Sequence, residues 1–339
     1  MSRCLMVLAL LFSCASYALQ MPNAERVESI KKQQWIGLSI VSPTTLWVSG
    51  ANGTIARTID GGETWNYSQP ASDQLQFRDI EGIDDRQAYA LSIGNEGQSR
   101  VYYTRDGGDS WRMLYRAENH TFLNCLAMSP SGEAWIYGDS IDDHWSMVRS
   151  ADGKNWLAVK SAVAEPPQAN EGGFASSGSC LRYANDTWII GTGNADVARV
   201  LVKSAFGIRY QTIETPMQAG PAAGITSVWP YSEQHFLIAG GHLSVEKSQG
   251  ARLWEYQSGD FTALPEPPMA GGLYSLAVAE HDATEWLLTS NPQGAAAYNR
   301  KTQQWHTLAD DNIWTIQCHA KRNCWMVGKD GYLAKLTWR

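Results

Sequence analysis

The sequence is poor in charge and has no long apolar stretch after its first residues. Only 18% of its 339 residues are Asp, Glu, Lys or Arg, and the formal net charge is −7. Since no basic excess or basic cluster is present, we expect no nucleic-acid partner. The one strongly apolar run lies at the N-terminus and is too short to cross a bilayer, so we expect no membrane span.

Metal and cofactor signatures are also missing. Neither CxxC nor HExxH occurs, and no GxGxxG follows a predicted strand. Three carboxylates lie within Gly138 to Trp145, but they lack the DxDxDG spacing of a calcium loop and read as a solvated acidic loop. The sequence therefore predicts no metal site and no cofactor.

What the chain does contain is one short phrase repeated at a fixed interval. TIDGGETW ends at Trp65, TRDGGDSW ends at Trp111 and SADGKNW ends at Trp156. This interval of about 45 residues fits one four-stranded blade of a β-propeller. The segments before each phrase alternate like short strands rather than helices, which excludes a helical solenoid.

Each phrase has the composition of a tight turn that leads into a strand. The Asp-Gly pairs accept positive φ, and the carboxylates of Asp60, Asp106 and Asp152 can accept hydrogen bonds from backbone amides. Trp65, Trp111 and Trp156 then begin the next strand and pack on a neighbour. The phrases resemble the Asp box, or BNR repeat, which lies on the outer hairpin of a blade. We therefore expect a structural role for these six residues and no catalytic role for the aspartates.

Eroded copies of the phrase continue along the chain. They end at Tyr210, Phe261 and Trp305, and a last segment, Asn312 to Trp338, offers only three strands. ERVESI at Glu25 to Ile30 could supply the missing fourth strand and close the ring, which would remove exposed sheet edges. We predict an all-β, seven-bladed β-propeller closed by its N- and C-terminal strands, with six or eight blades as alternatives.

The N-terminal residues have the parts of an export signal. Arg3 precedes the apolar run, and small residues end at Ala18. We expect a signal peptide over 1–18 and one propeller domain over 19–339, in a periplasmic or secreted and monomeric protein. A lipoprotein is the alternative, because LFSC at Leu11 to Cys14 approaches a lipobox and Cys14 would then carry a lipid anchor.

Export would permit disulfides among the four remaining cysteines. Cys318 and Cys324 flank a five-residue loop between two predicted strands, which favours a hairpin disulfide. Cys125 and Cys180 fall on predicted inner strands of neighbouring blades. For them a pair of buried thiols and a bridge both remain open.

The inner strands of a propeller line a central channel, so polar residues where these strands start converge on one mouth. Carboxylates, amides, hydroxyls and arginines in these positions make a candidate polar binding pocket. The alternative is a set of hydrogen-bonded strand ends. The candidate binding residues are Arg78, Asp79, Asn124, Glu171, Ser176, Ser177 and Arg199.

From Phe77 onward the chain resembles the photosystem II stability/assembly factor-like propellers. The resemblance rests most on NEGGFASSG from Asn170 and IGTGNADVARV from Ile190, with FRD at Phe77 and WMVGKDGYLAKL at Trp325 in the same order. It implies a non-catalytic protein or peptide partner, although related sequences tend to carry Asp and Gly where this chain has Asn124 and Asn194.

The alternative is that the protein is a sialidase-like glycoside hydrolase or a carbohydrate-binding protein. Its ligand would then be a glycan rather than a peptide. Asp boxes recur in sialidases, where three arginines clamp the substrate carboxylate beside a tyrosine nucleophile and a glutamate. Arg78 and Arg199 are candidates for the clamp and Glu171 for the acid or base. The sequence offers no third arginine and no tyrosine partner, so we expect binding rather than catalysis.

Overall fold

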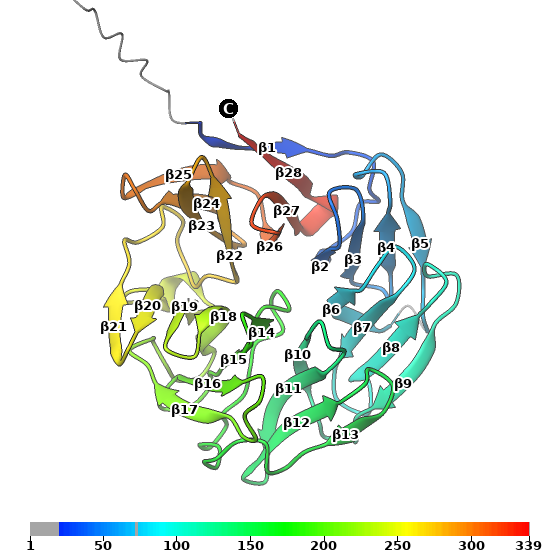
Figure 1. Cartoon of the computed structure of the whole chain (residues 1–339), viewed down its shortest axis with the longest axis vertical. Coiled ribbons are helices and arrows are strands. Elements are labelled where there is room, and N and C mark those ends of the chain that lie inside the picture. The colour runs from blue at the N-terminus through cyan, green and yellow to red at the C-terminus, as the bar shows by residue number, and fades with distance from the viewer. Residues whose placement is uncertain (1–19, 72–73, 339) are drawn as a thin grey trace, which may run out of the picture.

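The computed structural model describes residues 20–71 and 74–338, and strands make up nearly all of their regular structure. These strands form seven four-stranded antiparallel sheets arranged around a ring (Figure 1). The helical content of the described residues is two short 3-10 turns, η1 (Val245–Lys247) and η2 (Lys329–Gly331). The predicted seven-bladed β-propeller is confirmed. The expected signal peptide and Cys14 lie outside the described residues.

Each blade begins with an inner strand, and three further strands follow outward in order. The first three blades are β2 (Trp35–Ile40), β3 (Leu46–Gly50), β4 (Ile55–Thr58) and β5 (Asn66–Ser68); β6 (Gln76–Gly82), β7 (Ala88–Ile93), β8 (Arg100–Thr104) and β9 (Arg112–Arg116); and β10 (Leu123–Met128), β11 (Ala134–Ile141), β12 (His144–Ser150) and β13 (Trp156–Ala158). The next three are β14 (Leu181–Ala184), β15 (Thr187–Gly191), β16 (Arg199–Ser204) and β17 (Gln211–Glu214); β18 (Ala223–Ser232), β19 (His235–His242), β20 (Leu253–Gln257) and β21 (Asp260–Ala263); and β22 (Ser275–His281), β23 (Thr284–Asn291), β24 (Gly294–Asn299) and β25 (Gln304–Ala309).

The seventh blade joins the two ends of the chain. It contains β26 (Ile313–His319), β27 (Asn323–Gly328), β28 (Leu333–Trp338) and, outermost, β1 (Pro22–Arg26), which pairs antiparallel with β28. The expectation of closure by an N-terminal strand is met, but the strand starts three residues before the expected Glu25. The last contact of this pairing is the hydrogen bond that the Val27 N–H donates to the Leu333 carbonyl. After it the chain leaves the seventh blade and continues to β2 of the first blade.

Every repeated phrase forms the turn between the third and fourth strands of a blade. In the first copy, Asp60 Oδ1 accepts hydrogen bonds from the Thr64 N–H at 2.9 Å and the Thr58 hydroxyl at 2.7 Å. Asp106 repeats both contacts with Ser110 and Thr104. These carboxylates therefore stabilise turns at the outer edge of the blades and lie away from the inner strands that line the channel.

Buried aromatic residues on the second strands pack the blades against one another. Each blade has one near the start of this strand, and they are Trp47, Tyr89, Trp135, Trp188, Phe236, Trp286 and Trp325. In the second, third and fourth blades the aromatic residue that ends the phrase packs on the second strand of the preceding blade. Between ring centroids, Trp111 lies 6.2 Å from Trp47, Trp156 lies 6.2 Å from Tyr89, and Tyr210 lies 5.4 Å from Trp135. The eroded fourth copy thus keeps the residue that the packing requires.

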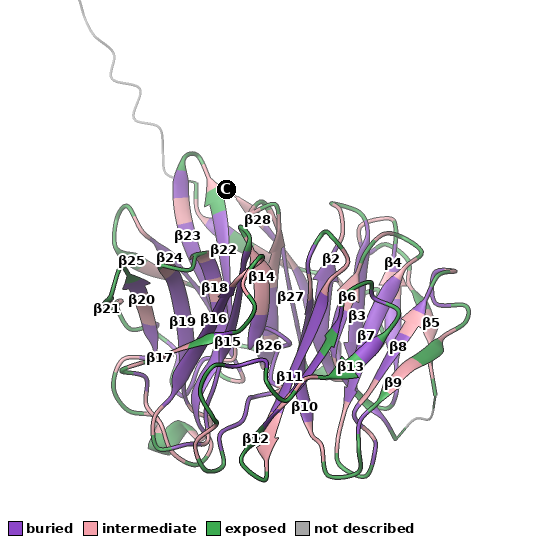
Figure 2. Cartoon of the chain, turned by 60° about the horizontal axis from the view of Figure 1, so that its bottom comes forward, coloured by how far each residue is buried: buried purple, intermediate pink, exposed green. Residues whose placement is uncertain are grey.

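The core forms a wall around the ring, with exposed residues concentrated on the connecting loops (Figure 2). Two disulfides lie in this wall, Cys125–Cys180 and Cys318–Cys324. The sequence left open whether Cys125 and Cys180 are two buried thiols or a disulfide, and in the structure they form a disulfide. Among the described residues, no helix has the length and apolar character needed to span a membrane.

Candidate functional site

The inner strands of neighbouring blades are joined all around the ring by polar or covalent links. Four links have one pattern: a side-chain oxygen accepts a hydrogen bond from a backbone N–H on the next inner strand. The seven links, in blade order, are Ser39 with Gly82, Asp79 with Leu126, Cys125 with Cys180, Ser179 with Ser227, Ser227 with Leu276, Ser275 with Ile316, and Thr315 with Ile36.

Asp79 is the acidic member of this set and is almost fully buried. Its Oδ2 accepts from Leu126 N–H at 2.7 Å, and its Oδ1 accepts from Ile80 N–H at 2.9 Å. Burial raises the pKa of Asp79 well above its usual value, and the nearby carboxylate of Glu81 adds to this rise, against the two hydrogen bonds. The side chain predicted to face a ligand instead connects two blades.

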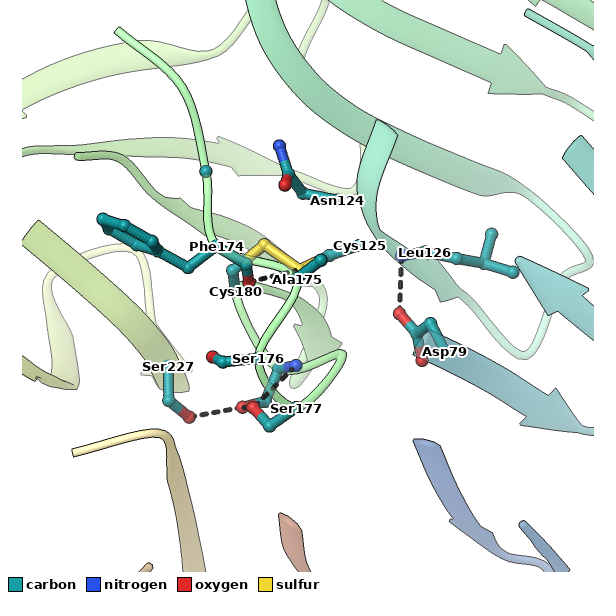
Figure 3. Close-up of a disulfide and its surroundings, with 12 residues drawn as sticks. Asp79, Asn124, Cys125, Leu126, Phe174, Ala175, Ser176, Ser177, Cys180 and Ser227 are labelled. Atoms are coloured by element: carbon teal, nitrogen blue, oxygen red, sulfur yellow. Dashed lines mark hydrogen bonds between the residues drawn. A yellow bond between two sulfur atoms is a disulfide. The ribbon is translucent and has the colours of Figure 1, made fainter. Parts of the chain in front are cut away.

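The loop before β14 enters the channel and closes it. We call residues Glu171–Cys180 the plug; all of them except Ala175 are buried. Figure 3 shows the plug beside the Cys125–Cys180 disulfide, with Ser177 lying near Ser227. Ser177 Oγ donates to the Tyr274 carbonyl at 2.7 Å, and the Thr315 hydroxyl donates to the Ser177 carbonyl at 3.3 Å. Ser176 Oγ reaches the same Tyr274 carbonyl at 3.5 Å.

A buried ion pair fixes the first residue of the plug. Arg199 Nε donates to Glu171 Oε1 at 3.0 Å and its Nη2 donates to Oε2, while Oε2 also accepts from Gln168 N–H at 2.8 Å. Glu171 is fully buried. Although burial opposes the charged form of Arg199, the hydrogen bonds and charge of Glu171 outweigh it and raise the Arg199 pKa. Both groups are thus occupied by each other, which removes them from a sialidase-like clamp.

Asn124 is likewise used inside the protein. Its amide nitrogen donates to Asp139 Oδ1 at 2.8 Å, and that oxygen also accepts from Gly173 N–H at 3.1 Å. Asn124 therefore supports the plug from the third blade. The structure brings Asp79, Asn124, Ser176 and Ser177 to the plugged part of the channel as expected for strand starts, but they are buried and hydrogen-bonded rather than open to a ligand.

Arg78 is the one predicted binding residue that remains at the surface of this mouth. Its guanidinium lies 5.0 Å from the ring centroid of Trp314, and Trp314 meets Tyr274 edge to face at 5.3 Å. Nη1 of Arg78 donates to the plug carbonyl of Ala175 at 3.4 Å, and Nη2 donates to Gln76 at 2.9 Å. Burial lowers the pKa of Arg78, with Tyr274 opposing the shift. Side chains from three blades thus form a half-buried cationic and aromatic cluster on the plug.

Sequence reasoning missed Trp314 and a second polar group on the other side of the plug. Glu81, Arg182, Trp229 and Gln317 share a cavity of about 200 Å³ there. Each stands two residues after a residue that links blades, namely Asp79, Cys180, Ser227 and Thr315. The two-residue period of a strand could have found them, because side chains two apart point to the same face.

Comparison with known proteins was made on both sequence and structure. No family model and no curated protein matches this chain. Among solved structures, YCF48 from Cyanidioschyzon merolae is similar at a TM-score of 0.62 with 14% identity, covering 92% of this chain and 98% of that one. The fold resembles that of YCF48. A structure of YCF48 bound to D1 peptide matches at a TM-score of 0.61 with 14% identity, covering 93% of this chain and 96% of that one.

Propellers of other groups are similar to the same degree. The Pan2 WD40 domain of Neurospora crassa has a TM-score of 0.62 with 10% identity, covering 90% of this chain and 89% of that one. At such identities the likeness to YCF48 and to Pan2 establishes the propeller fold and no more. The function has to be argued from the residues of this chain.

Proposed function

We propose that this protein is an exported, non-catalytic propeller that binds a peptide segment of a partner protein at the plugged mouth of its channel. The observation that carries the proposal is the cluster of Arg78, Tyr274 and Trp314 on the plug. Arginine, tyrosine and tryptophan are the residues that dominate binding energy at protein interfaces. Here they come from three blades and are only partly buried.

The shape of this mouth favours an extended segment over a small molecule. The plug fills the channel with buried, hydrogen-bonded residues, so a ligand meets a closed surface there rather than a deep pocket. A segment lying across that surface can place an acidic side chain on the Arg78 guanidinium and apolar groups against the two rings. We therefore propose an acidic or carboxylate-bearing peptide.

Two further observations support the wider proposal. The disulfides Cys125–Cys180 and Cys318–Cys324 suit an oxidising compartment, which agrees with export guided by the N-terminal segment. A structure with the same fold, that of YCF48, holds a D1 peptide. A role in stabilising or assembling the partner follows by analogy with that protein.

Fluorescence anisotropy with pools of short labelled peptides tests the proposal. We expect an acidic pool to bind more tightly than a basic pool, and R78Q and W314A each to weaken its binding about tenfold, or ~1.4 kcal/mol. F206A is the control, because Phe206 is exposed on the outer hairpin of the fourth blade. Equal binding by all three variants, or no binding by any pool, contradicts the proposal; binding of oligosaccharides alone favours the carbohydrate alternative.

A further inference from the structure

The cavity on the far side of the plug contains two opposite charges that do not pair directly. Glu81 comes from β6 of the second blade and Arg182 from β14 of the fourth. Among the described residues, neither side chain forms an ion pair with the other, and Glu81 accepts no hydrogen bond from a protein group. Arg182 donates one, from Nη2 to the Leu276 carbonyl at 3.2 Å, and its buried Nε has no protein partner.

The surroundings hold the arginine in place and line the space between the charges, which stays partly open to solvent. The guanidinium of Arg182 lies 5.2 Å from the ring centroid of Trp229. Gly178 and Ser179 of the plug line the same cavity, as does Gln317 from β26. Burial lowers the pKa of Arg182 to about 10 and raises that of Glu81 to about 7, while both residues keep part of their surface exposed.

We propose that this cavity binds a small bipolar molecule with an ammonium group and a carboxylate group a few bonds apart, such as an amino acid. Its carboxylate lies on the Arg182 guanidinium, which suits a planar, two-oxygen acceptor. Its ammonium group faces Glu81, and the amide of Gln317 is available to either end. The volume of about 200 Å³ restricts the ligand to short side chains.

A bipolar ligand suits the site better than a simple anion or cation. A lone carboxylate would satisfy Arg182 but leave Glu81 facing a second negative charge, and a lone amine would leave Arg182 without an anion. An unpaired charge in a buried site is costly, whereas a ligand that supplies both partners relieves both. The site is separate from the peptide surface, because the plug lies between them.

Isothermal titration of the full chain with glycine, L-alanine and L-serine tests this inference. Acetate and ethylamine serve as ligands with one charge each, and L-tryptophan serves as an oversized one. We expect saturable binding of at least one small amino acid, binding at least tenfold weaker for acetate and ethylamine, and none for L-tryptophan. E81Q and R182K should each weaken amino-acid binding at least tenfold, whereas the exposed controls E233Q and R105Q should not.

The pH dependence separates the ligand classes and does not depend on the variants folding. Arg182 and Tyr183 on β14 are the other titratable groups that line the cavity. Asp79 on β6 lies outside the lining but interacts electrostatically with Glu81. Since an ammonium ligand needs ionised Glu81, its affinity should rise about tenfold from pH 6 to pH 8. Acetate should bind less tightly over the same range, because ionised Glu81 repels it.

Several outcomes overturn the inference. If no small amino acid produces binding heat at millimolar concentration, the proposed class of ligand is wrong. Acetate binding as tightly as glycine shows an anion site instead, and unchanged binding in folded E81Q and R182K, checked by circular dichroism, places the ligand elsewhere. Loss of peptide binding in R78Q leaves the result unaffected, so this inference and the proposed function fail independently.

Discussion

The carboxylate of Asp79 accepts a hydrogen bond from the backbone N–H of Leu126 at 2.7 Å and thereby joins the inner strands of two blades. Ser227 makes the same contact with the N–H of Leu276 at 2.9 Å, and Ser275 with that of Ile316 at 3.2 Å. One geometric task is thus performed by two residue types at equivalent places. We expect these links to stabilise the closed ring, and each can be tested separately.

Removal of a linking hydroxyl should destabilise the ring. In Ser227→Ala the N–H of Leu276 stays buried without its acceptor, so we expect a loss of about 1–3 kcal/mol in the free energy of unfolding. Urea denaturation measures it. Ser161→Ala is the control, because Ser161 is exposed. A loss in Ser227→Ala no larger than in the control would show that the link does not stabilise the ring.

A methyl group at Gly178 should disturb the plug. This residue has φ of +73°, and an added Cβ would lie 2.4 Å from Asp79 Oδ1. Gly132 has φ of +90° with open space around it, so Gly132→Ala measures the backbone strain alone, about 1–2 kcal/mol. Gly178→Ala should lower the melting temperature clearly further. Similar melting temperatures for the two variants would mean that the plug accommodates the added methyl group without loss of stability.

The buried glutamate of the plug should matter far more than its exposed neighbour. Glu171→Gln leaves the Arg199 guanidinium buried beside a neutral amide, for which we expect a loss of about 3–5 kcal/mol. Glu165 lies 3.5 Å from the same guanidinium but has 61% of its side chain exposed, so Glu165→Gln is the matched control with a loss of about 0–1 kcal/mol. Chemical denaturation of both variants makes the comparison; equal losses contradict it.

The two disulfides should differ in their effect on stability. Cys125 and Cys180 are 55 residues apart, whereas Cys318 and Cys324 are 6 apart. Loop-closure entropy predicts about 4 kcal/mol for the long bridge and about 2 kcal/mol for the short one. Paired Cys→Ser variants, compared by denaturant midpoints, check the order. A larger loss for the Cys318 and Cys324 pair would refute the chain-entropy argument.

Acid should weaken the outer hairpins between about pH 4 and pH 2. Hydrogen bonds from Thr64 and Thr58 lower the pKa of Asp60 to about 2, and Asp106 and Asp152 shift equally for the same reason. A carboxyl whose pKa is lower in the folded state stabilises the protein above its unfolded pKa, and this is lost as pH falls through the folded value. The triple variant D60N/D106N/D152N should show a smaller loss of melting temperature over that range than the parent; an unchanged acid profile would count against it.

The repeated phrases were enough to predict the blades because their contacts are local. A turn such as Thr58 to Thr64 satisfies its own carboxylate within a few residues, and Trp65, which follows, packs against a cluster that includes Trp325 of the seventh blade. The spacing therefore predicted six blades with their outer hairpins, and the strands of the last segment together with the N-terminal segment added the seventh, with six or eight blades as alternatives. The sequence predicted that an N-terminal strand closes the ring, but it placed the start of this strand at Glu25, three residues after its observed start at Pro22. An edge strand of five residues has no turn signal in the sequence that would set its register.

The sequence placed Arg78, Asp79 and Asn124 at the starts of inner strands, whereas Arg199, expected there too, lies on β16, the third strand of its blade. The tertiary structure decided what each of these side chains contacts. Strand starts converge in any propeller, so Arg78 and Asp79 could be placed from the repeat. Whether a polar side chain faces solvent or a buried N–H depends on what fills the channel, and the plug comes from a loop whose sequence has no periodic signal. Glu171 meets Arg199, which lies 28 residues later on β16 of the fourth blade. Arg78 of the second blade meets Trp314 of the seventh, and that contact forms only when the two ends of the chain are brought together in the ring.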